Sequence, residues 1–272
     1  MYAHDRRILH AADGARLRRA LGAAAAAFLM ALPLAAQVPT DPRAAQPERP
    51  TVATHAWTVA PGYLELESGV EWDRNPGGSH TLGTPTELKI GLAPRLQLAL
   101  QGTLNRPPQT SLAPGDVTLV LKYRLADDLP LLGAFAVSPG VKLPAGSASH
   151  GTGTTDVSLL LISSHALGPV SLDINVGWTH RSGDGSRAPR DATLWTVSAG
   201  APLRGSLGLA AEVFGYPRTG GPAGSAGTVA FLGGPTLALT RRLVLDLGAI
   251  VRLRGPQPNA WYAGLVANLG RI

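Results

Sequence analysis

The feature that most constrains this 272-residue chain is an alternation of polar and apolar side chains with a period of two residues. Residues 63–73 are one example: apolar side chains occupy one face, and the opposite face carries Glu65, Glu67 and Glu71. Successive side chains point to opposite sides of a strand, whereas a helix repeats every 3.6 residues. The chain is therefore expected to fold as strands that each have one polar and one apolar face.

Five segments alternate strongly and seven more do so weakly. Together they predict twelve strands, at residues 63–73, 84–92, 95–105, 116–125, 133–143, 155–166, 169–181, 192–202, 206–215, 228–239, 242–253 and 260–271. Their length of about ten residues is what a tilted strand needs to cross a bilayer.

The connections between these strands alternate between long and short. The predicted long connections are rich in Gly, Pro, Ser, Asn and Asp and follow the odd-numbered strands, at residues 74–83, 106–115, 144–154, 182–191, 216–227 and 254–259. Tight links such as 93–95, 167–169 and 240–241 follow even-numbered strands. This rhythm is typical of outer-membrane barrels, which have long external loops and short periplasmic turns.

The placement of charge separates a membrane barrel from a soluble β-sandwich, which also alternates. Facing lipid at mid-membrane costs a Lys or Arg about 2–4 kcal/mol, so lipid excludes charge from one face. Fifteen ionisable residues fall on the polar faces, namely Glu65, Glu67, Glu71, Glu87, Lys89, Arg95, Asp116, Lys122, Arg124, Lys142, Asp156, Asp173, Glu212, Asp246 and Arg252. The sequence thus predicts an all-β, antiparallel transmembrane barrel of about twelve strands, with the sandwich as the alternative.

The N-terminus has the pattern of a secretory signal peptide. A basic region ending at Arg19 precedes the uncharged run Ala20–Leu32, and small residues allow cleavage near position 36. The predicted divisions are a signal peptide at 1–36, an extended leader at 37–60 and the barrel at 61–272. The Pro-rich leader is either a disordered periplasmic tail or a plug that enters the lumen, and we expect the tail.

Composition excludes several classes of function. The net charge of +6 comes largely from the N-terminal arginines, and no basic patch interleaved with aromatic residues follows, so no nucleic-acid partner is expected. The chain contains no cysteine, which excludes disulfides and thiolate metal sites. No cofactor is predicted, since the histidines are scattered one per segment.

Three motifs carry a family resemblance. Gly115–Asp116 opens a strand that ends in Lys122–Leu125, then Lys142–Gly146 follows, and Gly153–Asp156 opens the next strand. Over residues 55–271 the sequence resembles the outer-membrane family named MetA-pathway of phenol degradation. The resemblance implies a barrel that passes small, often aromatic, compounds and has no catalytic residues. The chain departs from the common barrel pattern by ending in Ile272 rather than in an aromatic residue.

The polar face of the first strands supplies the candidate site residues. Ten of them are expected to line the lumen: Glu65, Glu67, Glu71, Glu87, Lys89, Arg95, Asp116, Lys122, Arg124 and Lys142. Two interpretations stay open. The opposed charges form a selective constriction, or they form ion pairs that knit the interior together.

The leading functional hypothesis is a passive channel in the bacterial outer membrane, not an enzyme, for small solutes that include aromatic or hydrophobic ones. The expected partners are outer-membrane lipid, the solute and the barrel-assembly machinery. One alternative is a closed barrel with a structural or surface-interaction role. Another is a lipid-modifying barrel enzyme, for which the Ser and His residues at 163–165 and 180–182 are the only candidates.

Overall fold

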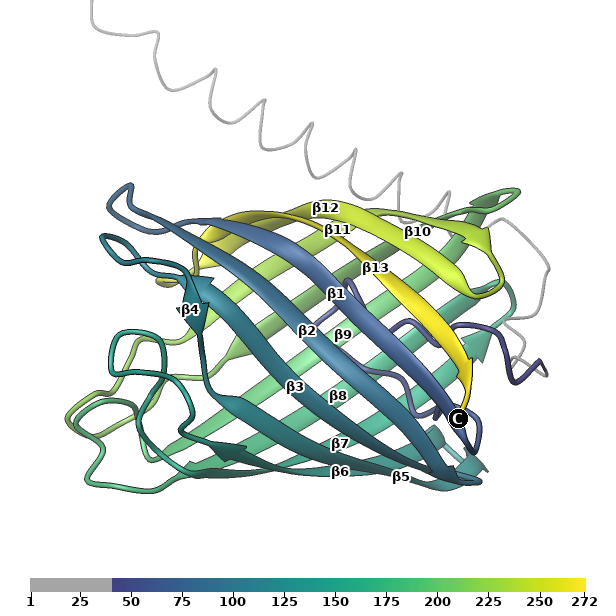
Figure 1. Cartoon of the computed structure of the whole chain (residues 1–272), viewed down its shortest axis with the longest axis horizontal. Helices are drawn as coiled ribbons and strands as arrows, with labels where there is room; N and C mark the ends of the chain where they lie inside the picture. The colour runs from purple at the N-terminus through teal and green to yellow at the C-terminus, as the bar shows by residue number, and fades with distance from the viewer. Residues whose placement is uncertain (1–40) are drawn as a thin grey trace, which may run out of the picture.

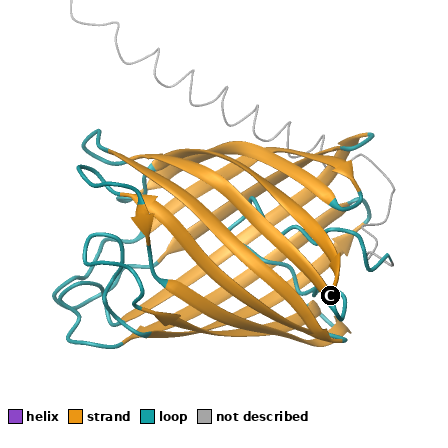
Figure 2. Cartoon of the chain, in the orientation of Figure 1, coloured by secondary structure: helices purple, strands orange, loops and turns teal. Residues whose placement is uncertain are grey.

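The computed structural model describes residues 41–272 of the chain. The predicted signal peptide and the first residues of the predicted leader lie outside the described residues. Within the described range, no helix has the length and apolar character that a membrane span requires. Figure 2 shows these residues as strands, loops and turns.

Twelve long antiparallel strands and one two-residue strand make up the protein, and they close into a single barrel (Figure 1). Each long strand pairs with its sequence neighbours, and β1 closes the barrel by pairing with β13. The strands are β1 (Tyr63–Arg74), β2 (His80–Ala93), β3 (Leu96–Arg106), β4 (Ala113–Pro114), β5 (Val117–Leu129), β6 (Gly133–Leu143), β7 (Asp156–Leu167), β8 (Val170–Arg181), β9 (Asp191–Arg204), β10 (Leu207–Tyr216), β11 (Thr228–Thr240), β12 (Leu243–Arg254) and β13 (Asn259–Arg271).

The predicted fold class is confirmed, and the strand bounds differ from the prediction mainly in β5, which ends at Leu129 rather than at residue 125, and in β2. This strand begins at His80 rather than at residue 84, because His80 and Thr81 pair with Arg74 and Asp73 of β1. The first connection is therefore residues 75–79, shorter than predicted, and it turns through Gly77 and Gly78, which both have positive φ.

The barrel has two distinct ends. Connections of two or three residues lie at one end, which we call the short-turn end, at 94–95, 130–132, 168–169, 205–206 and 241–242. The opposite, long-loop end carries the longer segments, including 144–155, 182–190 and 217–227. The C-terminus lies at the short-turn end, where β13 finishes beside the start of β1 (Figure 1).

The distribution of side chains is the reverse of that in a water-soluble protein. Large apolar residues face outward, and Leu247 and Trp261 are 58% and 71% exposed. Charged residues face inward, and Lys89 and Glu65 are fully buried. A soluble sandwich would bury the first group and expose the second, so the closed barrel with an apolar outer belt replaces that alternative.

Residues 41–60, which we call the plug segment, lie inside the barrel. The segment is held at the short-turn end, where Asp41 pairs with Arg241 at 2.9 Å and the Ala45 N–H donates to the Arg241 carbonyl. It then runs through the interior, as the purple trace in Figure 1 shows, and returns to the same end to enter β1. The expected tail is therefore wrong for residues 41–60, and the alternative of a plug describes them.

The outward belt yields a test of the barrel's orientation towards lipid. Leu247→Arg places a charge on the outer face near the middle of β12 and should lower the free energy of unfolding by about 2–4 kcal/mol. Urea unfolding of the barrel in lipid vesicles measures this cost. Leu131→Arg is the control, since Leu131 is 97% exposed in a short turn outside the belt. An equal cost for both variants would contradict the lipid-facing assignment of β12.

Candidate functional site

The lumen is built around backbone N–H groups of the plug segment. Carboxylates of the barrel wall accept hydrogen bonds from five of these N–H groups, with N–O distances of 2.7–3.0 Å. Glu65 accepts a hydrogen bond from the Gln46 N–H. Glu67 accepts hydrogen bonds from the N–H groups of Glu48 and Arg49. Glu212, on the other side of the barrel, accepts from Val52 and Ala53 at 2.7 Å each. An extended Pro-rich segment forms no ladder of its own, so these carboxylates take the place of a neighbouring strand.

Uncharged side chains hold the remaining part of the plug segment. Asn175 is bidentate: its Oδ1 accepts the Thr54 N–H at 2.7 Å, and its Nδ2 donates to the Thr54 carbonyl at 2.9 Å. Ser164 accepts from Ala56 at 2.8 Å, and Gln97 accepts from Val59 at 2.9 Å. Burying an N–H without a partner costs about 1–3 kcal/mol. The segment is therefore seated by polar contacts distributed around the whole wall.

A buried charge cluster lies at the centre of these contacts. Lys89 of β2 lies 2.8 Å from Glu65 and 2.6 Å from Glu67 of the adjacent strand β1. Glu48 of the plug segment lies 3.8 Å from Lys89 and pairs closely with Lys122 of β5. Burial raises the pKa of Glu48, but Lys122 and Lys89 outweigh this effect and hold the pKa well below its usual range. Glu48 thus remains ionised and connects two lysines that lie on different strands.

Arg49 makes the second ionic contact of the plug segment. Its guanidinium pairs with Asp246 of β12 at 3.2 Å. The side chain lies against Gly69 and Gly264, which are directly opposite each other in the β1–β13 ladder. A Cβ atom at either glycine would fall 2.5 Å from an atom of the Arg49 guanidinium. The two glycines therefore provide the space in which this arginine sits.

The structure distributes the ten predicted lumen residues over three regions. Glu65, Glu67, Lys89 and Lys122 converge on the plug segment, as described above. Glu65 and Lys89 are directly opposite across the β1–β2 pair. These two residues therefore form an ion pair between adjacent strands, of the kind that the second interpretation describes.

The other predicted residues lie nearer the two ends. Arg95 lies in the turn before β3 with a φ of 70°, not in the lumen wall, and pairs with Asp127. Arg124 also pairs with Asp127, at 3.0 Å, and lies 4.6 Å from the Trp57 ring of the plug segment. Towards the long-loop end, Lys142 pairs with Asp116 at 3.0 Å. Glu87 borders the cavities described next, and Glu71 lies two residues from Asp73 on the inner side of β1.

The free space of the lumen lies to one side. On the β10–β13 side, buried apolar residues fill the interior and pack against Val52 of the plug segment, namely Phe214, Ala230, Leu232, Ile250, Ala260 and Tyr262. A cavity of about 450 Å³ remains beside them and is floored by plug residues 48–54. Its wall is mixed: apolar residues such as Val120, Leu160 and Leu194 lie beside a polar set, namely Glu87, Gln101, Thr118, Ser138, Ser158 and Arg181. A second cavity, of about 290 Å³, shares Glu87 and Gln101 with the first.

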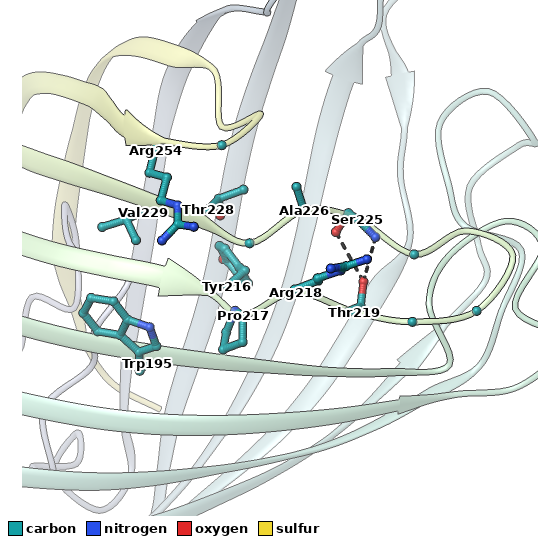
Figure 3. A pocket seen from close by; sticks show the side chains of 15 residues that line it. Trp195, Tyr216, Pro217, Arg218, Thr219, Ser225, Ala226, Thr228, Val229 and Arg254 are labelled. Carbon is teal, nitrogen blue, oxygen red and sulfur yellow. Dashed lines mark hydrogen bonds between the residues drawn. The ribbon is translucent and has the colours of Figure 1, made fainter.

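A larger cavity, of about 900 Å³, lies at the long-loop end beneath residues 217–227 (Figure 3). Five glycines and the loop backbone form much of its lining. The Thr219 and Ser225 hydroxyls, joined by a dashed line in Figure 3, lie 3.3 Å apart and thus satisfy each other. This cavity offers mainly loop backbone to a ligand, whereas the cavity above the plug segment offers a set of converging side chains.

The Ser and His residues named for the enzyme hypothesis do not form a nucleophile–base pair. Ser163 lies 2.9 Å from His165 Nε2, but its hydroxyl donates to the Leu132 carbonyl at 2.7 Å. The ring nitrogen must then donate to the serine oxygen, so it does not act as a base towards it. His180 pairs with Asp191 at 2.9 Å. Among residues 41–272, no group of three or more acidic or histidine side chains is arranged to hold a metal ion.

Comparison with solved structures identifies the architecture. The crystal structure of the COG4313 outer membrane channel from Pseudomonas putida F1 matches with a TM-score of 0.61 and 14% identity, covering 79% of this chain and 98% of that one. The NanC porin matches with a TM-score of 0.52 and 13% identity, and the KdgM porin with 0.51 and 10%; each match covers 75% of this chain and 98% of the other.

No family model matches the chain. No curated protein matches it either. At these identities the structural likeness establishes the fold alone. The barrel has the architecture of outer-membrane channels and porins.

The glycine pair beneath Arg49 gives a test of how the plug segment is held. Gly264→Ala adds a methyl group whose three nearest atoms all belong to the flexible Arg49 side chain, so the barrel should fold while the Arg49–Asp246 pair is displaced. Loss of one partner of a buried ion pair costs about 3–5 kcal/mol, so the plug segment should open more often. Because the chain has no cysteine, Ala53→Cys provides a unique probe at a buried plug position.

Maleimide labelling of that cysteine is expected to be at least about tenfold faster in the Gly264→Ala background, since about 1.4 kcal/mol already gives a tenfold change. Gly102→Ala is the matched control, because an added methyl at Gly102 meets no atom within 4 Å. Equal labelling rates in the Gly264→Ala and Gly102→Ala backgrounds would show that Arg49 does not hold the segment.

Proposed function

We propose that this protein is a passive channel for small solutes in the bacterial outer membrane, and that the plug segment controls passage. The observation that carries this proposal is the way in which the plug segment is held inside the lumen. The polar side of the lumen is blocked by one noncovalently held segment, whose contacts are hydrogen bonds and ion pairs. Water can replace such contacts when the segment moves, whereas an apolar core would resist it.

The alternative of a closed structural barrel is less well supported by the interior. A barrel of this size can be filled by side chains of its own strands. Here the strands fill the β10–β13 side and a smaller region at β6 and β7, where Ala136 and Ile162 pack against Ala56, and cavities of about 450 and 290 Å³ remain unfilled. The closed barrel nevertheless makes a distinct prediction, which is the absence of current after the plug segment has been removed.

The nature of the solute belongs to the same proposal. The sequence resemblance to the MetA-pathway of phenol degradation family suggests aromatic or hydrophobic compounds. The cavity above the plug segment is lined by apolar residues and also by hydroxyl, amide and charged groups. A purely hydrophobic solute would desolvate these groups without pairing them. We therefore favour solutes that carry polar groups, and we retain membership of that family as a proposal.

The location and partners follow from the same reasoning. The signal peptide predicted at residues 1–36 would export the chain, and the apolar belt would contact outer-membrane lipid. The short-turn end, with both ends of the barrel chain, would face the periplasm, as in other outer-membrane barrels. Insertion would require the barrel-assembly machinery.

Planar-bilayer recording tests the channel. The full mature chain should show small currents, and a variant that lacks residues 41–58 should show a conductance several-fold larger, since the segment that blocks the polar side is gone. The control shortens the 217–227 loop by a few residues, which alters the long-loop end but leaves the plug segment in place. Insertion of both forms without any current would support the closed-barrel alternative and refute the channel.

A further inference from the structure

We infer that the cavity above the plug segment binds small organic cations that carry hydrogen-bonding groups, such as hydroxylated ammonium compounds. This inference rests on the proposed function, because it names the class of solute that such a channel would favour. It depends on the charges of the cavity wall, on the register of β1 and β2, and on the hydroxyl groups that line the cavity.

The first observation is an imbalance of charge in the wall. Each basic residue that lines the cavity already has a carboxylate partner: Arg49 pairs with Asp246, Lys122 with Glu48, and Arg181 with Asp156 at 3.3 Å. Glu87 forms no ion pair with any residue in the described range 41–272. Its Oε1 accepts a hydrogen bond from the Gln101 amide at 3.0 Å. The cavity therefore presents one uncompensated negative charge and no uncompensated positive one.

The second observation is the strand register. Glu87 of β2 lies directly opposite Glu67 of β1. Like charges in directly opposed positions destabilise a strand pair. Lys89 neutralises Glu67 from the other side, at 2.6 Å, and leaves Glu87 facing the cavity. A bound cation beside Glu87 would offset the repulsion that this register creates.

The inner side of β1 carries further negative charge towards the long-loop end. Glu71 and Asp73 point inward on this strand, and neither forms an ion pair with the residues that the structure describes. Several carboxylates that line one wall of a narrow lumen focus a negative potential and concentrate cations. Glu71 and Asp73 line none of the cavities described above, so they would act on a cation at Glu87 only through this potential.

The third observation concerns hydrogen bonding. Ser138 lines the cavity, and its hydroxyl makes no hydrogen bond to another group within residues 41–272, so it is available to a ligand. The Thr118 and Ser158 hydroxyls line the same cavity. These groups suit a ligand that carries hydroxyl or amide groups, and Val120 and Leu160 provide contact for its carbon skeleton.

An anionic ligand does not fit this arrangement. It would lie against Glu87, and it could recruit a basic residue only by separating a buried ion pair, which costs about 3–5 kcal/mol. A neutral polyol could use the hydroxyl groups but would gain nothing from the carboxylate. The order of affinity expected from the wall is therefore cation, then neutral compound, then anion.

Three matched sugars test this order: protonated glucosamine, glucose and glucuronate share a ring and differ in charge. Isothermal titration calorimetry on the full mature chain, refolded in detergent micelles at neutral pH, measures binding without requiring conduction. Glucosamine is expected to bind at least about tenfold more tightly than glucose, since a charge-assisted hydrogen bond contributes about 1.5–3 kcal/mol. Glucuronate is expected to show no binding.

Two substitutions at Glu87 assign the effect to this side chain. Glu87→Gln keeps the shape and should lower the affinity for glucosamine about tenfold, with little change for glucose. Glu87→Lys should create binding of glucuronate, a gain that misfolding cannot imitate. Asp184→Asn removes one negative charge from the 182–190 loop outside the lumen and serves as the control.

The outcomes separate this inference from the proposed channel. Equal affinity for the three sugars, or an unchanged preference in Glu87→Gln, overturns the cation site even if the barrel conducts. Selective binding of glucosamine by a barrel that carries no current in planar bilayers would refute the channel and leave the cation site standing.

Discussion

The interior of this barrel depends on one constraint, which is that buried backbone N–H groups must have acceptors. The plug segment has three prolines and no regular secondary structure, so it cannot satisfy its own amides. Side chains from β1, β3, β7, β8 and β10 provide the acceptors instead. The inward carboxylates thereby have a role that is distinct from solute selection, since they make it possible for an extended segment to be buried at all.

The same contacts divide the lumen into two unlike halves. Val52 of the plug segment joins the apolar residues of β10–β13, and this half is packed like a small protein core. The other half retains charged and hydroxyl-bearing side chains around free space. A solute path, where one exists, is therefore off-centre and follows β1 to β9.

Much of the architecture was predictable from sequence, because alternation reports which residues share a face and lipid enforces that alternation strictly. Charge on the inner face, the closed antiparallel sheet and most strand bounds were obtained in this way.

The position of residues 41–60 was not predicted, since an extended Pro-rich segment has no period that links it to a surface. A signal was nevertheless present. Glu212 and Asp246 lie near the middle of strands β10 and β12, and β9 to β13 offer no Lys or Arg at that depth. The carboxylates of these two residues therefore required hydrogen-bond donors from elsewhere in the chain. Arg95 was misplaced for a different reason, because a turn residue can continue the alternation of the strand that follows it.

The contacts of the plug segment also bear on the order in which the protein assembles. Arg49 and Asp246 are 197 residues apart in the chain, and Val52 and Glu212 are 160 apart. Contacts of such separation carry a large loop-closure cost and form late unless earlier structure brings their ends together. The hairpins of neighbouring strands can form first, but the set of acceptors around the wall exists only when β12 and β13 have joined the sheet. The segment that leads the folded chain in sequence is thus among the last to be seated, and its burial marks the completion of the barrel.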